Sequence, residues 1–83
     1  MNKVQIYTSD YCPYCIRAKN LLNSKGIEYE EINLDGDPGK KLETMEKLKW
    51  RTVPIILIGG ELIGGYDQLA ALERSNKLDE LLN

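Results

Sequence analysis

Residues 4–15 read VQIYTSDYCPYC and contain the only two cysteines of the chain, Cys12 and Cys15. Apolar and polar side chains alternate from residue 3 to residue 8, which is typical of a strand half buried against a core, and the polar pair Ser9-Asp10 ends this run. Proline suits the first position of a helix, so Pro13 predicts a helix with Cys12 as its N-cap and Cys15 in its first turn. The cysteine pair is therefore expected where a strand leads directly into a helix.

This predicted helix start favours ionisation of Cys12. Unpaired backbone N–H groups and the positive end of the helix dipole would face its sulfur, and both stabilise a thiolate. Residues three apart on a helix have Cβ atoms about 5–6 Å apart, so a disulfide to Cys15 should form with modest local adjustment. We predict Cys12 as a nucleophile in a pair that opens and closes reversibly.

Two other uses of the cysteines compete with the redox one, a static bridge and a metal site. A static bridge that closes so short a loop removes little unfolded-state entropy and would stabilise the fold poorly. Two cysteines without any histidine cannot complete a tetrahedral zinc site within one molecule, although a Cu(I) site or an iron–sulfur cluster shared by two subunits stays open. The absence of histidine also excludes Cys–His catalysis and leaves thiol–disulfide exchange as the favoured chemistry.

Composition indicates a small intracellular protein. The 83 residues, 42% of them hydrophobic, are expected to form one domain, residues 1–83. A net charge of −2 argues against a nucleic-acid partner. No segment approaches the roughly 18 apolar residues of a membrane helix, and the first residues lack the apolar stretch of a secretory signal. We expect a cytoplasmic protein with no membrane partner, because free thiols persist in the cytoplasm.

Two predicted helices and one strand follow the cysteine motif. The first helix should bury a stripe of apolar side chains and end at Gly26. A second strand is expected around residues 29–34, and its many acidic residues suit an edge position. The pair Asp37-Pro38 predicts the start of a second helix. The inward-facing side chains expected are Cys15, Ala18, Leu21 and Leu22 in the first helix, and Leu42, Met45 and Leu48 in the second.

A hairpin is the best-specified element of the second half. Residues 53–58 form a mostly apolar run, Gly59-Gly60 is a two-residue turn signal, and residues 61–63 return as the partner strand. A third helix is indicated by Leu69 and Leu72, and a short fourth one by residues 76–82. The predicted order is therefore strand, helix, strand, helix, hairpin, helix.

With three separated motifs in this order, the chain resembles a glutaredoxin of the thioredoxin fold. The motifs are Cys12-Pro13-Tyr14-Cys15, Thr52-Val53-Pro54 and Gly64-Gly65-Tyr66-Asp67. The resemblance covers essentially the whole length. It implies an α/β protein with a central four-stranded mixed β-sheet flanked by helices (βαβαββα), with glutathione as co-substrate and no tightly bound cofactor.

The same resemblance implies a set of site residues. Cys12 and Cys15 would be catalytic, and the proline that matches Pro54 is cis in this family, exposing the backbone of the residue before it. That residue would hold the cysteine portion of glutathione, and the motif at residues 64–67 would grip the two ends of the γ-glutamyl group. The glutathione-binding residues implied are Tyr14, Arg51, Thr52, Val53, Pro54, Gly65, Tyr66 and Asp67.

This chain departs from the pattern just before its cysteines. Many glutaredoxins carry a lysine three residues before the first cysteine, whereas this chain has Ser9, followed by Asp10. A carboxylate so close opposes thiolate formation, so we predict that the pKa of Cys12 is lowered less than in a lysine-bearing relative. Arg51, Lys49 and Arg17 are the candidates for the missing positive charge, and Arg51 is our first choice because it adjoins Thr52-Val53-Pro54. Trp50 stands where many relatives have a polar residue and would either fill space or flank the ligand groove.

The resemblance also implies the reaction and its partners. Cys12 would attack protein–glutathione mixed disulfides, and for protein disulfides such as that of ribonucleotide reductase Cys15 would resolve the intermediate. Nothing in the sequence asks for a second copy, so we expect a monomer. The alternatives are a redoxin reduced by thioredoxin reductase and a protein that binds Cu(I) or a 2Fe–2S cluster.

Overall fold

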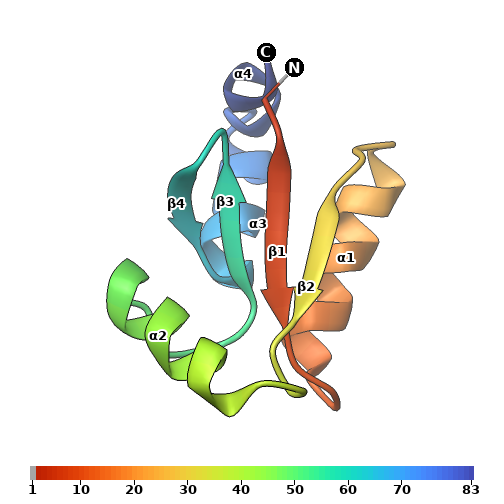
Figure 1. Ribbon diagram of the computed structural model, residues 1–83. Coiled ribbons are helices and arrows are strands. Elements are labelled where there is room, and N and C mark those ends of the chain that lie inside the picture. The colour runs from red at the N-terminus through yellow and green to blue at the C-terminus, as the bar shows by residue number, and fades with distance from the viewer. Residues whose placement is uncertain (1) are drawn as a thin grey trace.

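The computed structural model describes residues 2–83, which form four strands and four helices in the predicted order (Figure 1). The short fourth helix is present as expected. The elements are β1 (Val4–Thr8), α1 (Pro13–Ser24), β2 (Glu30–Asn33), α2 (Pro38–Leu48), β3 (Ile55–Ile58), β4 (Glu61–Gly64), α3 (Tyr66–Arg74) and α4 (Leu78–Leu82).

The strands form one mixed sheet in the order β2-β1-β3-β4. β1 pairs in parallel with β2 and antiparallel with β3, and β3 pairs antiparallel with β4. β2 is an edge strand, as its acidic residues predicted. Gly59 and Gly60 turn the hairpin with φ angles of +60° and +82°, values that glycine adopts without steric cost.

One face of the sheet carries the main core. Val4 and Ile6 of β1 point to the same side as Ile56 and Ile58 of β3, because alternate strand residues share a face. α1 and α3 cover this side, and Figure 1 shows both helices behind the sheet. Burying each large aliphatic side chain stabilises the fold by about 1.5–3 kcal/mol. The helical contributors to this core are Ala18, Leu22, Leu69, Leu78 and Leu82.

Both ends of α1 follow the local sequence. Cys12 is its N-cap and Pro13 its first residue, as predicted. At the other end Gly26 has a φ of +68°, its N–H donates to the Asn23 carbonyl (3.0 Å), and the Ile27 N–H donates to the Leu22 carbonyl (3.0 Å). These two hydrogen bonds are a common pattern at helices that end at a glycine. The cysteines are thus held on a helix with both ends capped.

The prediction that Leu42 faces inward is wrong. Its side chain is 57% exposed, and α2 contains no buried residue. The half-covered stripe of α2 runs through Lys41, Thr44, Met45 and Leu48. Since successive helix residues are about 100° apart, Leu42 lies just off that stripe. α2 lies over the face of the sheet opposite α1 and α3, where Thr44 and Leu48 line a pocket together with Tyr7 and Leu57.

The two ends of the described chain lie side by side, far from the cysteines (Figure 1). The Asn2 N–H donates to the Leu82 carbonyl (2.9 Å), and the Asn2 side-chain amide donates to the Leu81 carbonyl (2.7 Å). Across residues 2–83, no helix is both long and apolar enough to cross a membrane.

Candidate active site

The cysteine pair is asymmetric. Cys12 and Cys15 form a disulfide at the start of α1, with their Cα atoms 5.2 Å apart. Cys15 is only 2% exposed, whereas Cys12 is half-buried. The Cys15 N–H donates to the Cys12 sulfur (3.1 Å), the capping contact expected from Pro13. Only Cys12 combines access from outside with a donor aimed at its sulfur.

The second predicted motif lies directly beside this sulfur. The Val53–Pro54 peptide bond is cis, as the resemblance implied. The Val53 carbonyl oxygen lies 3.7 Å from the Cys12 sulfur, although the two residues are 41 positions apart. Because the disulfide has no S–H to donate, this contact records proximity rather than a hydrogen bond. The fold therefore places the backbone carbonyl of Val53 beside the Cys12 sulfur.

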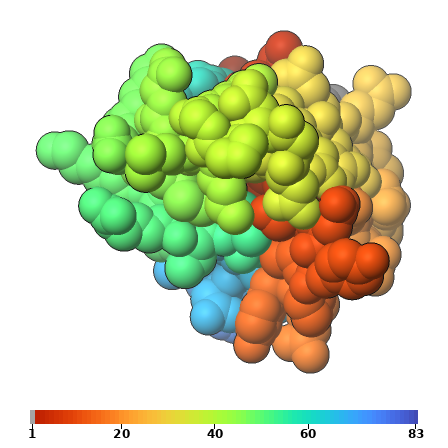
Figure 2. Space-filling view, turned by 60° about the horizontal axis from the view of Figure 1, so that its bottom comes forward, coloured from red at the N-terminus to blue at the C-terminus, as the bar shows by residue number. Residues whose placement is uncertain are grey.

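A groove of about 290 Å³ runs from Tyr14 to the start of α3. Figure 2 shows this end of the molecule, where the orange start of α1, the green to teal segment after α2 and the blue start of α3 meet. Six of the eight residues implied for glutathione binding line the groove. Its full lining is Tyr14, Trp50, Thr52, Val53, Gly65, Tyr66, Asp67 and Gln68.

The other two implied binding residues lie just outside the lining. Pro54 is buried, and its carbonyl oxygen would lie 3.5 Å from a Cβ placed on Gly65, so it borders the groove from behind. Arg51 is exposed on the segment between Trp50 and Thr52 and does not line the groove. A role for Arg51 therefore requires its long side chain to reach a ligand from the rim.

Aromatic side chains form much of the groove wall. The rings of Tyr14 and Tyr66 are tilted by 36° with centroids 6.2 Å apart, and the Arg17 guanidinium lies 5.2 Å from the Tyr14 centroid. Tyr14 is 52% exposed. An exposed, cation-backed aromatic pair offers a surface on which a peptide backbone can lie.

The glycine pair has a structural reason of its own. Gly64 has a φ of +124°, and a Cβ there would lie 2.9 Å from Gln68 Cγ and 3.1 Å from Trp50 Cη2. A Cβ on Gly65 would meet only ordinary contacts, of 3.5 Å or more. Gly64 is therefore required by packing inside the protein, and Trp50 both fills this space and flanks the groove.

Gln68 is a lining residue that the sequence reasoning missed. Its side-chain oxygen accepts from the Gly65 N–H (2.9 Å) at the start of α3. A Gln three residues after an N-cap is half of a capping box, so the spacing from Gly65 to Gln68 carried the signal.

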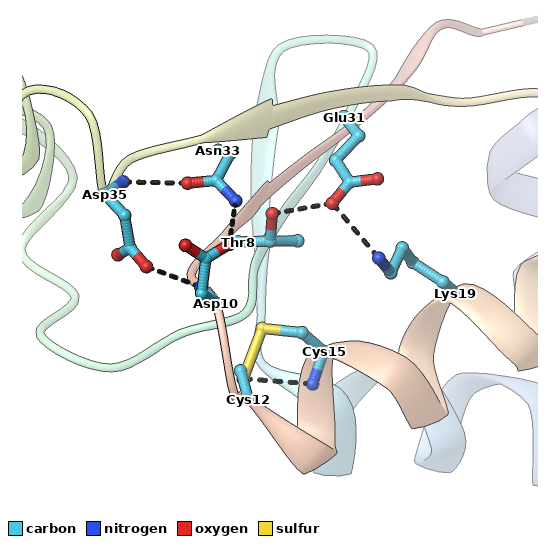
Figure 3. A network of polar contacts seen from close by, with 8 residues as sticks. All are labelled: Thr8, Asp10, Cys12, Cys15, Lys19, Glu31, Asn33 and Asp35. Carbon is cyan, nitrogen blue, oxygen red and sulfur yellow. Dashed lines mark hydrogen bonds and ion pairs between the residues drawn. A yellow bond between two sulfur atoms is a disulfide. The ribbon is translucent and has the colours of Figure 1, made fainter.

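A polar network surrounds the residues before Cys12 (Figure 3). The Asp10 N–H donates to the Asp35 carboxylate (2.6 Å), and the Asn33 amide donates to the Asp10 carboxylate (3.0 Å). The bond from the Asp10 backbone holds the pKa of Asp35 below its usual range. Asp10 was predicted to lie near the thiol, but its partners were not, because they come from another strand and the loop after it.

A second part of the network links β1, β2 and α1. The buried Thr8 hydroxyl donates to the Glu31 carboxylate (2.8 Å), which also pairs with Lys19 (3.1 Å). The hydroxyl bond lowers the pKa of Glu31, partial burial opposes this, and Lys19 adds to the lowering. Glu31 of β2 thus links the end of β1, through Thr8, to α1, through Lys19.

Comparison with known proteins decides the family. The family model described as Glutaredoxin matches residues 4–63. Over 83 residues the chain is 52% identical to a glutaredoxin of Pseudomonas aeruginosa, covering all of this chain and 99% of that protein. The chain belongs to the glutaredoxin family. Glutaredoxin 3 of Escherichia coli is 46% identical over 82 residues, which cover 99% of both chains.

Solved glutaredoxin structures share the whole fold. The solution structure of the Brucella melitensis glutaredoxin superposes with a TM-score of 0.88 at 48% identity, covering 99% of this chain and 89% of that one. A buckwheat glutaredoxin–glutathione complex gives a TM-score of 0.89 at 34% identity, covering 98% and 76%. The thioredoxin fold implied by the sequence is thereby confirmed.

Membership of the glutaredoxin family shows which type of reaction the protein catalyses. This glutaredoxin is a thiol–disulfide oxidoreductase, and glutathione is the family's substrate. Among the residues described, no three or more His, Cys, Asp or Glu side chains are grouped as metal ligands. The redox chemistry has a cysteine pair as its centre.

Proposed function

We propose that Cys12 is the attacking thiol and Cys15 the resolving thiol of a glutathione-dependent reductase. The asymmetry of the pair carries this assignment. Cys12 is accessible, accepts the Cys15 N–H and lies beside Val53, whereas Cys15 is closed off beneath it. An attacking sulfur must meet its substrate from outside, while a resolving sulfur needs to reach only its neighbour.

We propose that the groove holds glutathione. Backbone groups of Val53 next to the Cys12 sulfur suit the cysteine portion of the tripeptide, in the manner of an added strand. The start of α3, at Gly65 and Tyr66, offers N–H groups for a carboxylate, and exposed Asp67 offers an acceptor for an ammonium group. The remaining proposed contacts are Tyr14, Arg51, Thr52 and Pro54. The buckwheat relative was solved with glutathione, which supports this ligand.

The proposed reaction on a glutathionylated protein has two steps. The Cys12 thiolate attacks the glutathione sulfur of the mixed disulfide, and the target protein leaves as a thiolate. The thiolate of a second glutathione then attacks the sulfur of the glutathione on Cys12, which forms glutathione disulfide and regenerates the Cys12 thiolate. Only one of the two cysteines is needed.

Reduction of a protein disulfide uses both cysteines. Cys12 attacks one sulfur of the target and releases the other as a thiolate, and Cys15 then attacks the Cys12 sulfur and frees the target. The Cys12–Cys15 disulfide that results is the form seen in the structure. Two glutathione molecules reduce it again, which is favourable for a glutaredoxin potential of about −200 to −230 mV.

The setting of this reaction is part of the proposal. Glutathionylated proteins and disulfides of the ribonucleotide reductase type are the proposed targets, with no tightly bound cofactor. The chain would work as a monomeric single domain in the cytoplasm, where reduced glutathione is abundant. The bacterial relatives, full-length matches to this chain, support the domain assignment.

Cysteine variants test the assignment of the two thiols. Cys15→Ser is expected to keep turnover of a glutathionylated peptide and to lose dithiol reduction of a protein disulfide, whereas Cys12→Ser should lose both. Turnover is followed with glutathione, glutathione reductase and NADPH. Activity of Cys12→Ser on the glutathionylated peptide would contradict the assignment. Turnover supported only by thioredoxin reductase, or a coloured metal-bound protein without turnover, would favour the alternative functions.

A further inference from the structure

Trp50, the only tryptophan of the chain, forms the groove wall next to α3. Its six-membered ring lies over the glycine pair, with Cη2 3.1 Å from a Cβ placed on Gly64 and Cζ2 3.8 Å from one placed on Gly65. The indole nitrogen is bonded to the carbon next to Cζ2. The donor end of Trp50 is therefore on the side of the ring that meets the start of α3.

The indole N–H is closed to water and has no hydrogen-bond partner within the described part of the chain. A buried donor without an acceptor is unfavourable, and an indole nitrogen can only donate. The Gln68 side chain also lies beside Gly64, and its oxygen accepts a hydrogen bond from the Gly65 N–H (2.9 Å). The start of α3 thus combines one unsatisfied donor with one donor held by an exposed, displaceable side chain.

We propose that Trp50 is a specificity-determining residue that donates its indole N–H to a carboxylate of the bound thiol peptide at the start of α3. The inference rests on the proposed function, since it assigns a donor within the same groove. The arriving carboxylate displaces the Gln68 side chain, which uncovers the indole N–H and the Gly65 N–H together. The free N–H groups of the first helical turn and this side-chain donor favour an anion over a neutral group.

This arrangement makes affinity depend on one carboxylate. Asp67 supplies an acceptor beside these donors, so the end of the groove suits an α-amino-acid group with its carboxylate and ammonium side by side. In glutathione that group is the γ-glutamyl end. Thiol peptides without this carboxylate leave the indole donor unsatisfied and bind less well.

Replacement of a single atom group tests the donor. The 83-residue chain can be assembled by chemical ligation, with Trp50 replaced by β-(3-benzothienyl)alanine, which keeps the bicyclic ring and puts sulfur in place of N–H. The reduced proteins are titrated by NMR with S-methylglutathione, which cannot undergo exchange. A second titration uses its analogue with hydrogen in place of the γ-glutamyl α-carboxylate.

The replacement is expected to weaken S-methylglutathione binding about tenfold, corresponding to about 1.4 kcal/mol. Binding of the analogue without the carboxylate should be unchanged. In turnover of a glutathionylated peptide, KM should rise by a similar factor while kcat at saturation stays the same. Equal weakening of both ligands, or of neither, would overturn the role of the N–H. If native protein binds no S-methylglutathione and shows no glutathione-dependent turnover, the proposed function itself fails.

Trp50→Phe extends the test to recombinant protein. This variant should show the same selective loss of affinity for the carboxylate-bearing ligand. Its urea midpoint measures any loss of stability caused by the smaller ring. A matched Tyr14→Phe variant removes a hydroxyl elsewhere in the groove and should weaken both ligands equally or not at all. A carboxylate-selective loss in Tyr14→Phe of the same size would overturn the assignment to Trp50.

Discussion

At the scale of single residues, the Cys12 sulfur is subject to opposing influences. The Cys15 N–H and the start of α1 favour its thiolate. We expect Asp10 to oppose the thiolate, and the Asp10 carboxylate accepts a hydrogen bond from the Asn33 amide. The Asp35 carboxylate accepts the Asp10 N–H, and this bond holds the pKa of Asp35 below its usual range. We therefore expect activation of Cys12 to depend on its place at the start of α1.

Asp10→Asn is expected to lower the pKa of the Cys12 thiol, because it removes a nearby negative charge and keeps an oxygen that can accept from Asn33. The measurement is a pH titration of thiolate absorbance in the Cys15→Ser background, where only one thiol titrates. Glu80→Gln, which removes an exposed carboxylate on α4, serves as the control and should leave the titration unchanged. A higher Cys12 pKa in Asp10→Asn would contradict this account.

At the scale of elements, the junction of β4 and α3 is the tightest point of the site. Gly64 adopts a backbone conformation that other residues avoid, and Trp50 and Gln68 occupy the space that a Cβ on Gly64 would need. Trp50, in the loop after α2, therefore packs beside the start of α3. The groove keeps its shape because three segments meet at a residue without a side chain.

Gly64→Ala is expected to reduce the free energy of unfolding by about 2–4 kcal/mol, from backbone strain together with overpacking against Trp50 and Gln68. Urea unfolding followed by circular dichroism measures the loss. Gly36→Ala is the matched control, because its Cβ would meet no atom within 4 Å, and it should change stability by less than about 0.5 kcal/mol. Equal losses in the two variants would rule out packing at Gly64 as the cause.

At the scale of the whole molecule, Lys25 joins three helices. It caps the end of α1, and its ammonium group pairs with Glu73 of α3 (2.9 Å) and Asp79 of α4 (3.2 Å). The bond to Glu73, followed by that to Asp79, raises the pKa of Lys25. These ion pairs lie at the end of the molecule away from the cysteines, so they act on stability rather than on chemistry.

Lys25→Gln is expected to lower the urea midpoint at neutral pH and to reduce the loss of stability at high pH. A raised native pKa means that the contribution of Lys25 is complete below its unfolded value of about 10.4 and is lost as pH rises through the native pKa. In urea titrations at increasing pH across the alkaline range, the midpoints of the native protein and of Lys25→Gln should therefore converge. Lys47→Gln on α2 is the control, and a similar convergence there would show a general charge effect.

Much of this architecture was predictable because it depends on neighbouring residues. The N-cap at Cys12, the helix end at Gly26 and the turn at Gly59-Gly60 each follow from backbone geometry over a few positions. The order of strands and helices follows from the spacing of apolar residues. The motif at Cys12 and Cys15 also placed the cysteine pair at the first strand–helix junction.

The tertiary structure decided what depends on distant segments meeting. Leu42 is exposed because the orientation of α2 on the sheet, rather than its apolar pattern, selects the covered stripe. Asp10 meets Asn33 only because β1 and β2 are parallel neighbours. Trp50 and Gln68 join one wall because both pack on Gly64. The sequence alone determined the elements and the place of the cysteine pair at the start of the first helix, since both depend on residues within one or two helical turns. The groove beside that pair required the packed sheet and helices, which bring together side chains more than thirty residues apart.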